Sequence, residues 1–253
     1  MLQRMLVAAL LVQGIVAGGA HAYFQDFDGL SDGDPVTDLT GWSSVDIDGN
    51  PTSAPEMSHA STEVAFSPNN SAVFSDSTAG PRIVVDLADP AVLGVAPSSG
   101  VVRINYRFYY TTNDGSVKMF VNGIGSAGDD NDTNQIFRSA PYSEPPNNAS
   151  PLGSTTGGSW VSLAPIPPTP AATWNNIEYL VDLDADTVLY TFNGVSSGPH
   201  AHGPATDLGY VVFRPIADGV ASFIDDVDIT IVPEPVSLIL LGMAAPLVLR
   251  RRR

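Results

Sequence analysis

The amino-acid sequence predicts an all-β protein built as an antiparallel sandwich of two sheets. Across residues 23–231 apolar residues recur at every second position, the period of a strand with one buried face, rather than at every 3.6 residues. Glycine, proline, asparagine and aspartate interrupt these alternating segments at short intervals, as turns between strands require. About ten strands in a segment of this length favour two stacked sheets.

The clearest strand is predicted at residues 101–110, where apolar and polar side chains alternate. Its apolar face carries Val102, Ile104, Tyr106, Phe108 and Tyr110. Residues 117–121 form the next alternating segment. The Asn113-Asp114-Gly115 turn before it predicts a hairpin between the two strands.

A second hairpin is predicted from residues 177–183 and 188–192, which alternate on either side of an Asp184-Ala185-Asp186 turn. Trp174 opens this unit. Further strands are expected at residues 23–27, 44–48, 72–75, 82–87, 208–214 and 220–231.

The stretch at residues 139–173 breaks the alternation because it contains eight prolines. A plain loop of this length is unusual, so we expect a surface excursion that either lies across the sandwich as a cover or is mobile. Residues 160–163 are expected to add one short strand to it.

The N-terminal residues 1–22 have the three parts of a secretory signal peptide. A basic start ending at Arg4 precedes an apolar run, and Ala20-His21-Ala22 is a small-x-small cleavage site. We therefore expect the secretion machinery to export the chain and the mature protein to begin at or near Tyr23.

The C-terminal residues 232–253 combine a turn, an apolar run and a basic end. Prolines disfavour a helix before the run, and terminal arginines resist translocation. At about 1.5 Å per residue, the run at 236–249 reaches only ~21 Å, short of the ~30 Å hydrocarbon core, so a permanent spanning anchor is the weaker alternative. The turn and the basic end consist of Val232, Pro233, Glu234 and Pro235, and of Arg250, Arg251, Arg252 and Arg253.

This three-part order resembles the PEP-CTERM sorting signal of exported bacterial proteins. The resemblance implies recognition and cleavage by a membrane-embedded exosortase, with transient membrane association through a short C-terminal hydrophobic helix. It implies a cell-surface or extracellular destination for the domain at residues 23–231, and it carries no information on activity.

Residues 23–231 are strongly acidic. Of the 27 acidic and 11 basic residues in the chain, one acid and five bases lie in the terminal signals, which leaves 26 acids against 6 bases. A surface of this charge repels nucleic acid and anionic lipid. It either attracts divalent cations or only keeps the protein soluble. The chain has no cysteine, so it forms no disulfide.

Three segments resemble concanavalin-like and laminin-G-like jelly rolls. Residues 24–30, followed by Gly41-Trp42, are similar to an opening strand, and residues 174–194 run from a Trp through an Asp-containing turn to Tyr-x-x-Asn-Gly. Residues 223–227 are similar to a closing strand. The resemblance implies a jelly-roll sandwich and binding of extracellular polysaccharide.

Asp225 is the first candidate for a metal ligand. Strict alternation along the last strand places it on the same face as Phe223, Val227, Ile229 and Ile231, and therefore toward the core. The jelly-roll resemblance implies a structural calcium bound by Asp225 with Asp26 or Asp28. Two alternatives stay open, namely a carboxylate satisfied by hydrogen bonds, and a bulge that turns Asp225 outward.

Two other polar clusters are weaker candidates for metal sites. The loop at residues 129–134 imitates the start of a calcium loop, but its sixth position is Gln135 and its twelfth is Pro141, so a solvated turn is favoured. His200 and His202 supply two imidazoles without a third ligand, which is too few for zinc.

No catalytic signature occurs in the sequence. The Glu-x-Asp-x-x-Glu string of laminarinase-type hydrolases and the Gly-x-Ser-x-Gly elbow are both missing. We therefore expect a non-catalytic surface or biofilm-matrix protein that binds polysaccharide, with Tyr109 on the polar face of its strand as an aromatic platform. A purely structural or adhesive matrix component and, more remotely, a glycoside hydrolase or lyase are the alternatives.

Overall fold

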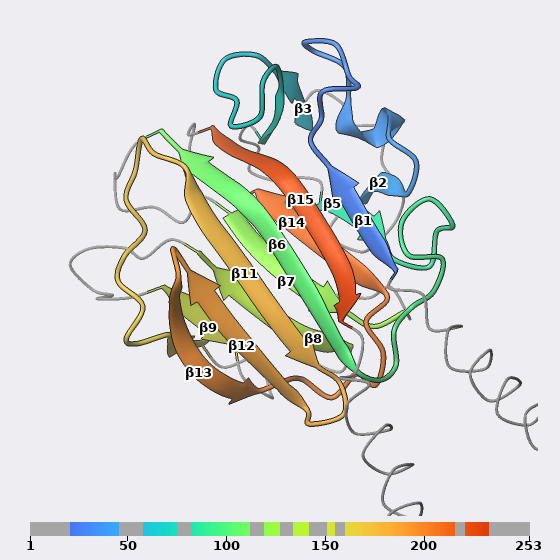
Figure 1. Ribbon diagram of the computed structural model, residues 1–253, viewed down its shortest axis with the longest axis vertical. Helices are drawn as coiled ribbons and strands as arrows, with labels where there is room; N and C mark the ends of the chain where they lie inside the picture. Colours follow the sequence, from blue (N-terminus) through green and yellow to red (C-terminus); the bar gives the residue numbers. More distant parts are fainter. Residues whose placement is uncertain are drawn as a thin grey trace, which may run out of the picture.

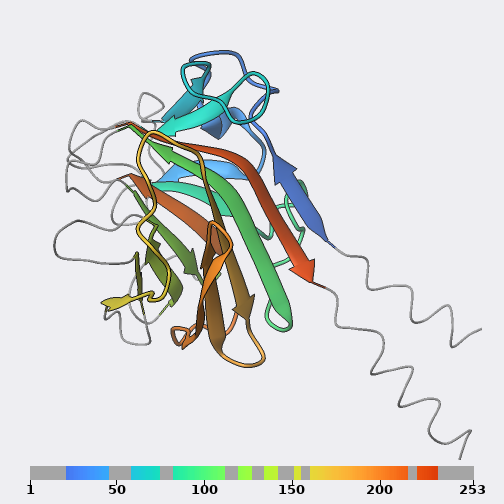
Figure 2. The same cartoon turned by 60° about the vertical axis from the view of Figure 1, so that its left-hand side comes forward.

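Two antiparallel β-sheets packed face to face make up the protein (Figure 1). Figure 2 shows them as two layers. The computed structural model describes residues 21–45, 58–74, 82–111, 119–126, 134–141, 151–154, 160–215 and 221–232. The predicted all-β sandwich is confirmed, since the only helical turn within these ranges is the 3-10 helix Val36–Asp38.

The first sheet, sheet A, has its longest strands at its centre. From one edge to the other it contains β13 (Val195–Ala201), β12 (Thr187–Phe192), β11 (Asn175–Asp182), β6 (Val101–Tyr110), β15 (Ser222–Val232), β4 (Ser71–Phe74) and β3 (Ser58–Ser61). The long strand β15 pairs with β4 near its start and with β1 (Ala22–Gln25) near its end.

The second sheet, sheet B, lies behind sheet A in Figure 1. Its order is β10 (Trp160–Ser162), β9 (Leu152–Ser154), β8 (Gln135–Ala140), β7 (Met119–Ile124), β14 (Tyr210–Pro215), β5 (Arg82–Asp86) and β2 (Trp42–Val45). All of its described pairings are antiparallel.

Aromatic side chains fill the space between the sheets. Along β6 the burial alternates as predicted, so that Tyr106, Phe108 and Tyr110 are fully buried. The ring of Phe213 from sheet B packs edge-on against Tyr106, with centroids 5.5 Å apart. Such offset and edge-to-face pairs add to the free energy gained by burying large rings.

A buried chain of hydroxyl groups joins the sheets inside this core. The Tyr179 hydroxyl of sheet A lies 2.9 Å from the Tyr106 hydroxyl and 3.0 Å from the Ser139 hydroxyl of sheet B. Burial raises the pKa of both tyrosines well above the usual value. The polar atoms are therefore neutral and mutually satisfied in an otherwise apolar interior.

The hairpin at residues 177–192 is confirmed. Strands β11 and β12 pair from Asp182↔Thr187 to Ile177↔Phe192. Asp186 in its turn has a positive φ of 52°, a conformation that aspartate tolerates better than most residues.

The other predicted hairpin is wrong. Strand β6 belongs to sheet A and β7 to sheet B, so the chain crosses from one sheet to the other after residue 110. The last two of the expected strands, now β14 and β15, also lie in different sheets. A turn sequence shows where a strand ends, but it does not show which sheet receives the next strand.

The proline-rich stretch at residues 139–173 is partly built into the sandwich. Its first residues belong to β8, and β9 and β10 continue from there to the edge of sheet B. The short strand expected at residues 160–163 is confirmed as β10. Ala172 N donates a hydrogen bond to Tyr110 O, which ties the end of the stretch to β6.

The two ends of the sandwich lie side by side. Ala22 pairs with Thr230, and Ile231 N donates a hydrogen bond to His21 O (Figures 1 and 2). Of the predicted cleavage residues, Ala22 and Tyr23 belong to β1, whereas Ala20 and residues 233–253 lie outside the described residues. No helix within the described ranges has the length and hydropathy needed to cross a membrane.

Replacing Tyr179 with Phe is expected to lower the free energy of unfolding by about 1–3 kcal/mol. The substitution leaves the buried Tyr106 and Ser139 hydroxyls without their shared partner. The measurement is urea unfolding of the wild type, Y179F and Y210F. The control removes a hydroxyl from a partly exposed ring and should stay within about 0.5 kcal/mol of the wild type. Equal losses in both variants would contradict the role of the buried hydroxyl chain.

Candidate functional site

A β-bulge in β15 determines which side chains reach the outer face of sheet A. Asp225 lies opposite Arg107 and Asp228 lies opposite Asn105, so two residues of β15 face one residue of β6. Asp226, in the bulge, has a positive φ of 49°. The bulge reverses the alternation of inward and outward side chains along the strand.

The prediction that Asp225 points into the core is therefore wrong, and the alternative with a bulge is correct. Before the bulge, Phe223 and Asp225 share the outer face with Tyr109 and Arg107. After it, Val227 and Ile229 belong to the core. A single extra residue thus separates two groups that strict alternation places together.

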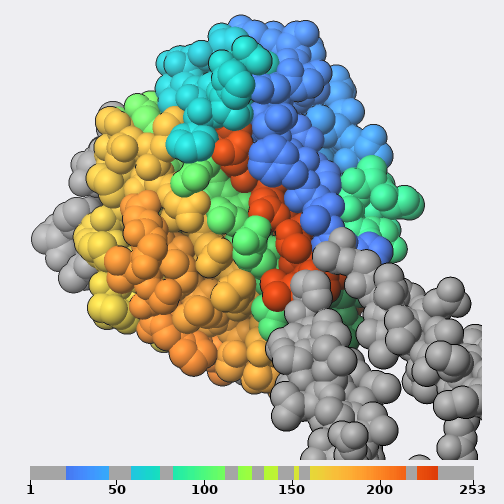
Figure 3. Space-filling model, in the orientation of Figure 1, coloured from blue at the N-terminus to red at the C-terminus, as the bar shows by residue number. Residues whose placement is uncertain are grey.

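Asp225 is nevertheless fully buried, because residues 62–70 cover it. In Figure 3 the segment 58–74, in cyan, lies against β15 at the top of the sheet A face. Phe66 N and Ser67 N each donate a hydrogen bond of 2.9 Å to Asp225 Oδ2, and Asp226 N donates one of 2.8 Å to Oδ1. The Ser67 hydroxyl also donates to this carboxylate, at 3.0 Å from Oδ1. The hydrogen-bonded alternative is confirmed.

Asp26 and Asp28 lie in the same neighbourhood, and both accept backbone N–H groups. Asp28 Oδ1 accepts from Asn69 N at 3.1 Å and from Asn70 N at 3.0 Å, which holds the far end of the covering segment. Asp26 Oδ1 accepts from Asp28 N at 3.2 Å. We call Asp26, Asp28, Asp225 and Asp226 the acidic cluster.

The charges of the acidic cluster oppose one another. Burial raises the pKa of Asp225 above its usual value, although hydrogen bonds from Ser67, Phe66 and Asp226 counteract this effect. Burial also raises the pKa of Asp226, and the nearby Asp225 raises it further, while Arg107 lowers it. Ionised Asp226 is therefore less favourable in the folded protein than in water.

The described residues do not present a cation cage. Calcium requires six to eight oxygen ligands that converge on one point. Within the described ranges no three carboxylate or imidazole groups converge in this way, and N–H donors occupy both oxygens of Asp225. Calcium bound by Asp225 with Asp26 or Asp28 stays a prediction.

Beside the acidic cluster, aromatic rings gather on the outer face of sheet A. Tyr109 lies 5.5 Å from Trp174 and 5.9 Å from Phe223 between ring centroids. Phe66 packs edge-on against Trp174 at 5.9 Å, and the Arg107 guanidinium carbon lies 4.4 Å from the Phe66 centroid. Phe66 is 45% exposed, and both Tyr109 and Trp174 are partly exposed.

We call Phe66, Tyr109 and Trp174 the aromatic patch. The sequence placed Tyr109 on the polar face of its strand, and it does lie there. Phe66 and Trp174 were not predicted as partners of Tyr109. The three residues come from separate segments, and no local spacing signals that they meet.

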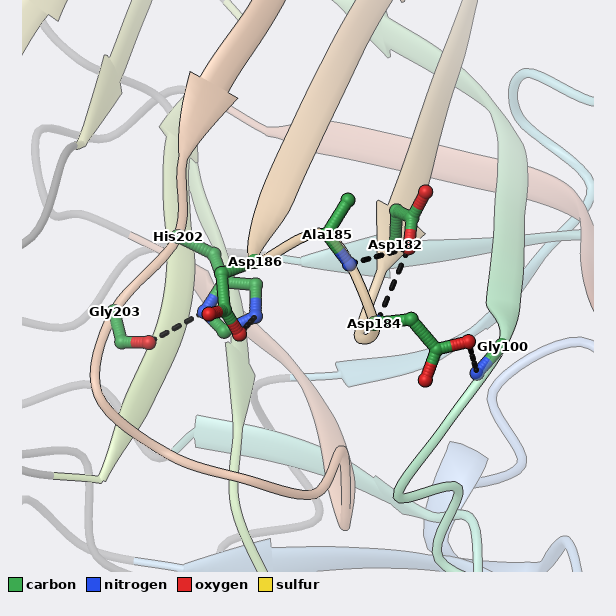
Figure 4. A network of polar contacts seen from close by, with 7 residues as sticks. All are labelled: Gly100, Asp182, Asp184, Ala185, Asp186, His202 and Gly203. Carbon is green, nitrogen blue, oxygen red and sulfur yellow. Dashed lines mark hydrogen bonds and ion pairs between the residues drawn. The ribbon is translucent and has the colours of Figure 1, made fainter.

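His200 and His202 have structural contacts of their own, and Figure 4 shows those of His202. His202 is buried, with Nδ1 2.5 Å from Gly203 O and Nε2 3.3 Å from Asp186 Oδ1. His200 packs edge-on against Tyr190, and burial lowers its pKa. The nearby Asp182 and Asp184 accept backbone N–H groups, as expected of carboxylates in turns. The loop at residues 129–133 lies outside the described residues.

The comparisons with known proteins identify the fold. No family model and no curated protein matches the sequence. The structure is similar to that of the cellulose induced protein Cip1, with a TM-score of 0.54, 16% identity and coverage of 81% of this chain and 95% of that one.

Two further solved structures resemble it to the same degree. Domain 4 of AbnA, a GH43 extracellular arabinanase from Geobacillus stearothermophilus, in complex with arabinotriose, has a TM-score of 0.51 at 15% identity, covering 83% and 92% of the two chains. The T. cruzi calreticulin globular domain has a TM-score of 0.53 at 8% identity, covering 88% and 91%. At such identities the likeness shows the jelly-roll sandwich alone.

Replacing Asp226 with Asn is expected to stabilise the protein at pH 7 by a few tenths of a kcal/mol to about 1 kcal/mol, because the side chain is partly exposed and solvent screens its charge. The folded-state pKa is raised above 3.8, so the stability tied to this group is present below that value and is lost as the pH rises through the folded-state pKa. Asn tolerates the positive φ at this position.

Thermal melts of D226N at pH 7 and at pH 3 test this expectation. The gain in Tm should appear at pH 7 and vanish at pH 3. Asp38→Asn, which removes the same charge from an exposed position on the 3-10 helix, is the control. A gain that persists at pH 3, or one that D38N matches, would rule out repulsion within the acidic cluster.

The calcium prediction requires that millimolar calcium raise the Tm and that a chelator reverse the rise, because a ligand that binds only the folded form stabilises it. Carried out on wild type and D226N together, this melt also shows whether the acidic cluster is the site. An unchanged Tm in the wild type would show that the prediction of a structural calcium is wrong.

Proposed function

We propose that this protein is an exported, non-catalytic module that binds polysaccharide at the aromatic patch. The main support for this proposal is that three partly exposed aromatic rings from separate segments meet on one sheet face. Sugar rings present apolar C–H faces that pack on flat aromatic side chains, while polar groups beside the rings accept and donate hydrogen bonds. Arg107 and the carboxylate of Asp226 supply such groups next to the patch.

The patch is held in a fixed shape by the buried contacts around it. Phe223 is fully buried and packs edge-on against the Tyr109 ring on the neighbouring strand. The N–H groups of Phe66 and Ser67 are bound to Asp225, so the segment that carries the Phe66 ring is tied directly to β15. A preformed surface loses little conformational entropy on binding, which favours affinity for an extended sugar chain.

Export and sorting belong to the same proposal. The sandwich begins at β1 with Ala22 and ends at β15 with Val232, and these are the residues at which the predicted signal peptide and the predicted sorting motif meet the domain. The described residues of the two predicted signals, His21, Ala22 and Val232, are exposed and lie outside the core. Intact-mass analysis of the protein recovered from cells tests this proposal, because both signals should be missing from the exported form.

Replacing Trp174 with Ala is expected to weaken binding to a neutral polysaccharide about tenfold or more, because it removes the central ring of the aromatic patch. Affinity electrophoresis in gels that contain neutral polysaccharides such as glucans, xylans and arabinans measures the change. Phe24→Ala is the matched control, since Phe24 is 59% exposed on β1 outside the patch.

Equal mobility of wild type and W174A in every polysaccharide gel would contradict binding at the aromatic patch. Retention of wild type that is lost equally in F24A and W174A would point to non-specific adsorption by exposed rings. Wild type that is retained by no polysaccharide would favour a structural or adhesive matrix component.

A further inference from the structure

The outer face of sheet B holds an arginine between two aromatic rings. The guanidinium carbon of Arg138 on β8 lies 4.5 Å from the ring centroid of Trp160 on β10 and 5.6 Å from that of Phe120 on β7. The two rings are 5.1 Å apart and inclined by 32°. Three strands thus fix the position of one cationic group.

Arg138 has no anionic partner in the described part of the chain. Among the described residues no carboxylate lies within ion-pair distance of its guanidinium group and no acceptor hydrogen-bonds to it, and its Nε is buried without a partner. Arg103 on sheet A, by contrast, pairs with Asp228. The chain has 27 acidic and 11 basic residues, so the missing partner does not reflect a shortage of carboxylates.

A second positive charge lies near the same rings. The guanidinium carbon of Arg214 on β14 is 6.0 Å from the Phe120 centroid, and Arg214 lies opposite Phe120 in the β14–β7 ladder. Arg138 and Arg214 are both partly exposed on this face. Arg138, whose guanidinium group has no carboxylate partner among the described residues, gives this place on an otherwise acidic protein a cationic group suited to an anionic ligand.

We propose that Arg138 binds the anionic group of an acidic glycan, either the carboxylate of a uronic acid residue or a sulfate ester. A planar guanidinium group matches two oxygens of such a group bidentately, and the two flanking rings hold the group in place. That the anion belongs to a glycan rests on the proposed function. The site itself lies on the opposite sheet from the aromatic patch and depends on none of its residues.

Titration calorimetry with polygalacturonate, its fully methyl-esterified form and dextran sulfate tests this assignment. If the anion is a uronate, wild type should bind polygalacturonate, and methyl esterification should abolish this binding because it removes the charge and keeps the sugar. Binding of dextran sulfate but not polygalacturonate assigns a sulfate ester, and the reverse assigns a uronate. If wild type binds neither acidic polymer, the proposal is wrong.

Arg138→Gln should weaken binding of the acidic polymer about tenfold or more, the effect of losing one charge-assisted hydrogen-bonding group. Arg138→Lys keeps the charge without the planar fork and should be intermediate. Arg103→Gln, which removes the same charge from sheet A, should bind like wild type. Thermal melts of all three variants accompany the titrations, and R138K decides the outcome if R138Q unfolds.

The variants separate this site from the aromatic patch. R138Q should keep its affinity for neutral polysaccharide, and W174A should keep its affinity for the acidic polymer. An R138Q variant that binds polygalacturonate as tightly as wild type overturns the assignment and leaves the proposed function in place. Loss of both kinds of binding in W174A alone overturns it as well, because both ligands then occupy one surface.

Discussion

The bulge in β15 is the constraint on which the candidate site depends. One extra residue lets a single strand bury Val227 and Ile229 between the sheets and still direct Phe223 and Asp225 to the outside. Both of these outward side chains position part of the aromatic patch. Phe223 packs against the ring of Tyr109, and Asp225 accepts a hydrogen bond from the backbone N–H of Phe66.

The free-energy penalty of burying the Asp225 carboxylate links the charge of this side chain to the position of residues 66 and 67. A carboxylate that is removed from water is destabilising unless hydrogen bonds replace its hydration. Four donors from residues 66, 67 and 226 do so, and the pKa stays raised in spite of them. The hydrogen bonds that compensate the charge are the same ones that position the covering segment, so local electrostatics and the shape of the outer face cannot vary independently.

Much of the fold could be predicted from residue alternation. Strand β6 and the β11–β12 hairpin follow the two-residue period closely, because one face of each strand is buried and the other is not. Sheet membership could not be predicted, since the turn at residues 113–115 gives no information on whether the next strand pairs or crosses over. The bulge could not be predicted either, because Asp226 adopts a positive φ that aspartate tolerates and no glycine marks the position.

The candidate site was predictable only where alternation alone decides exposure, as at Tyr109. Phe66 lies in a covering segment and Trp174 precedes a strand, so their meeting is a product of tertiary structure.

The β6–β15 ladder also sets how this surface is presented. Val101 lies opposite Val232 at one end of the ladder, and Tyr109 lies opposite Phe223 at the other. At roughly 3.3 Å per residue these ends are about 25 Å apart. A tether joined beyond Val232 would therefore attach the domain at the end of this ladder that lies opposite the aromatic patch, and would leave the three rings clear of the point of attachment.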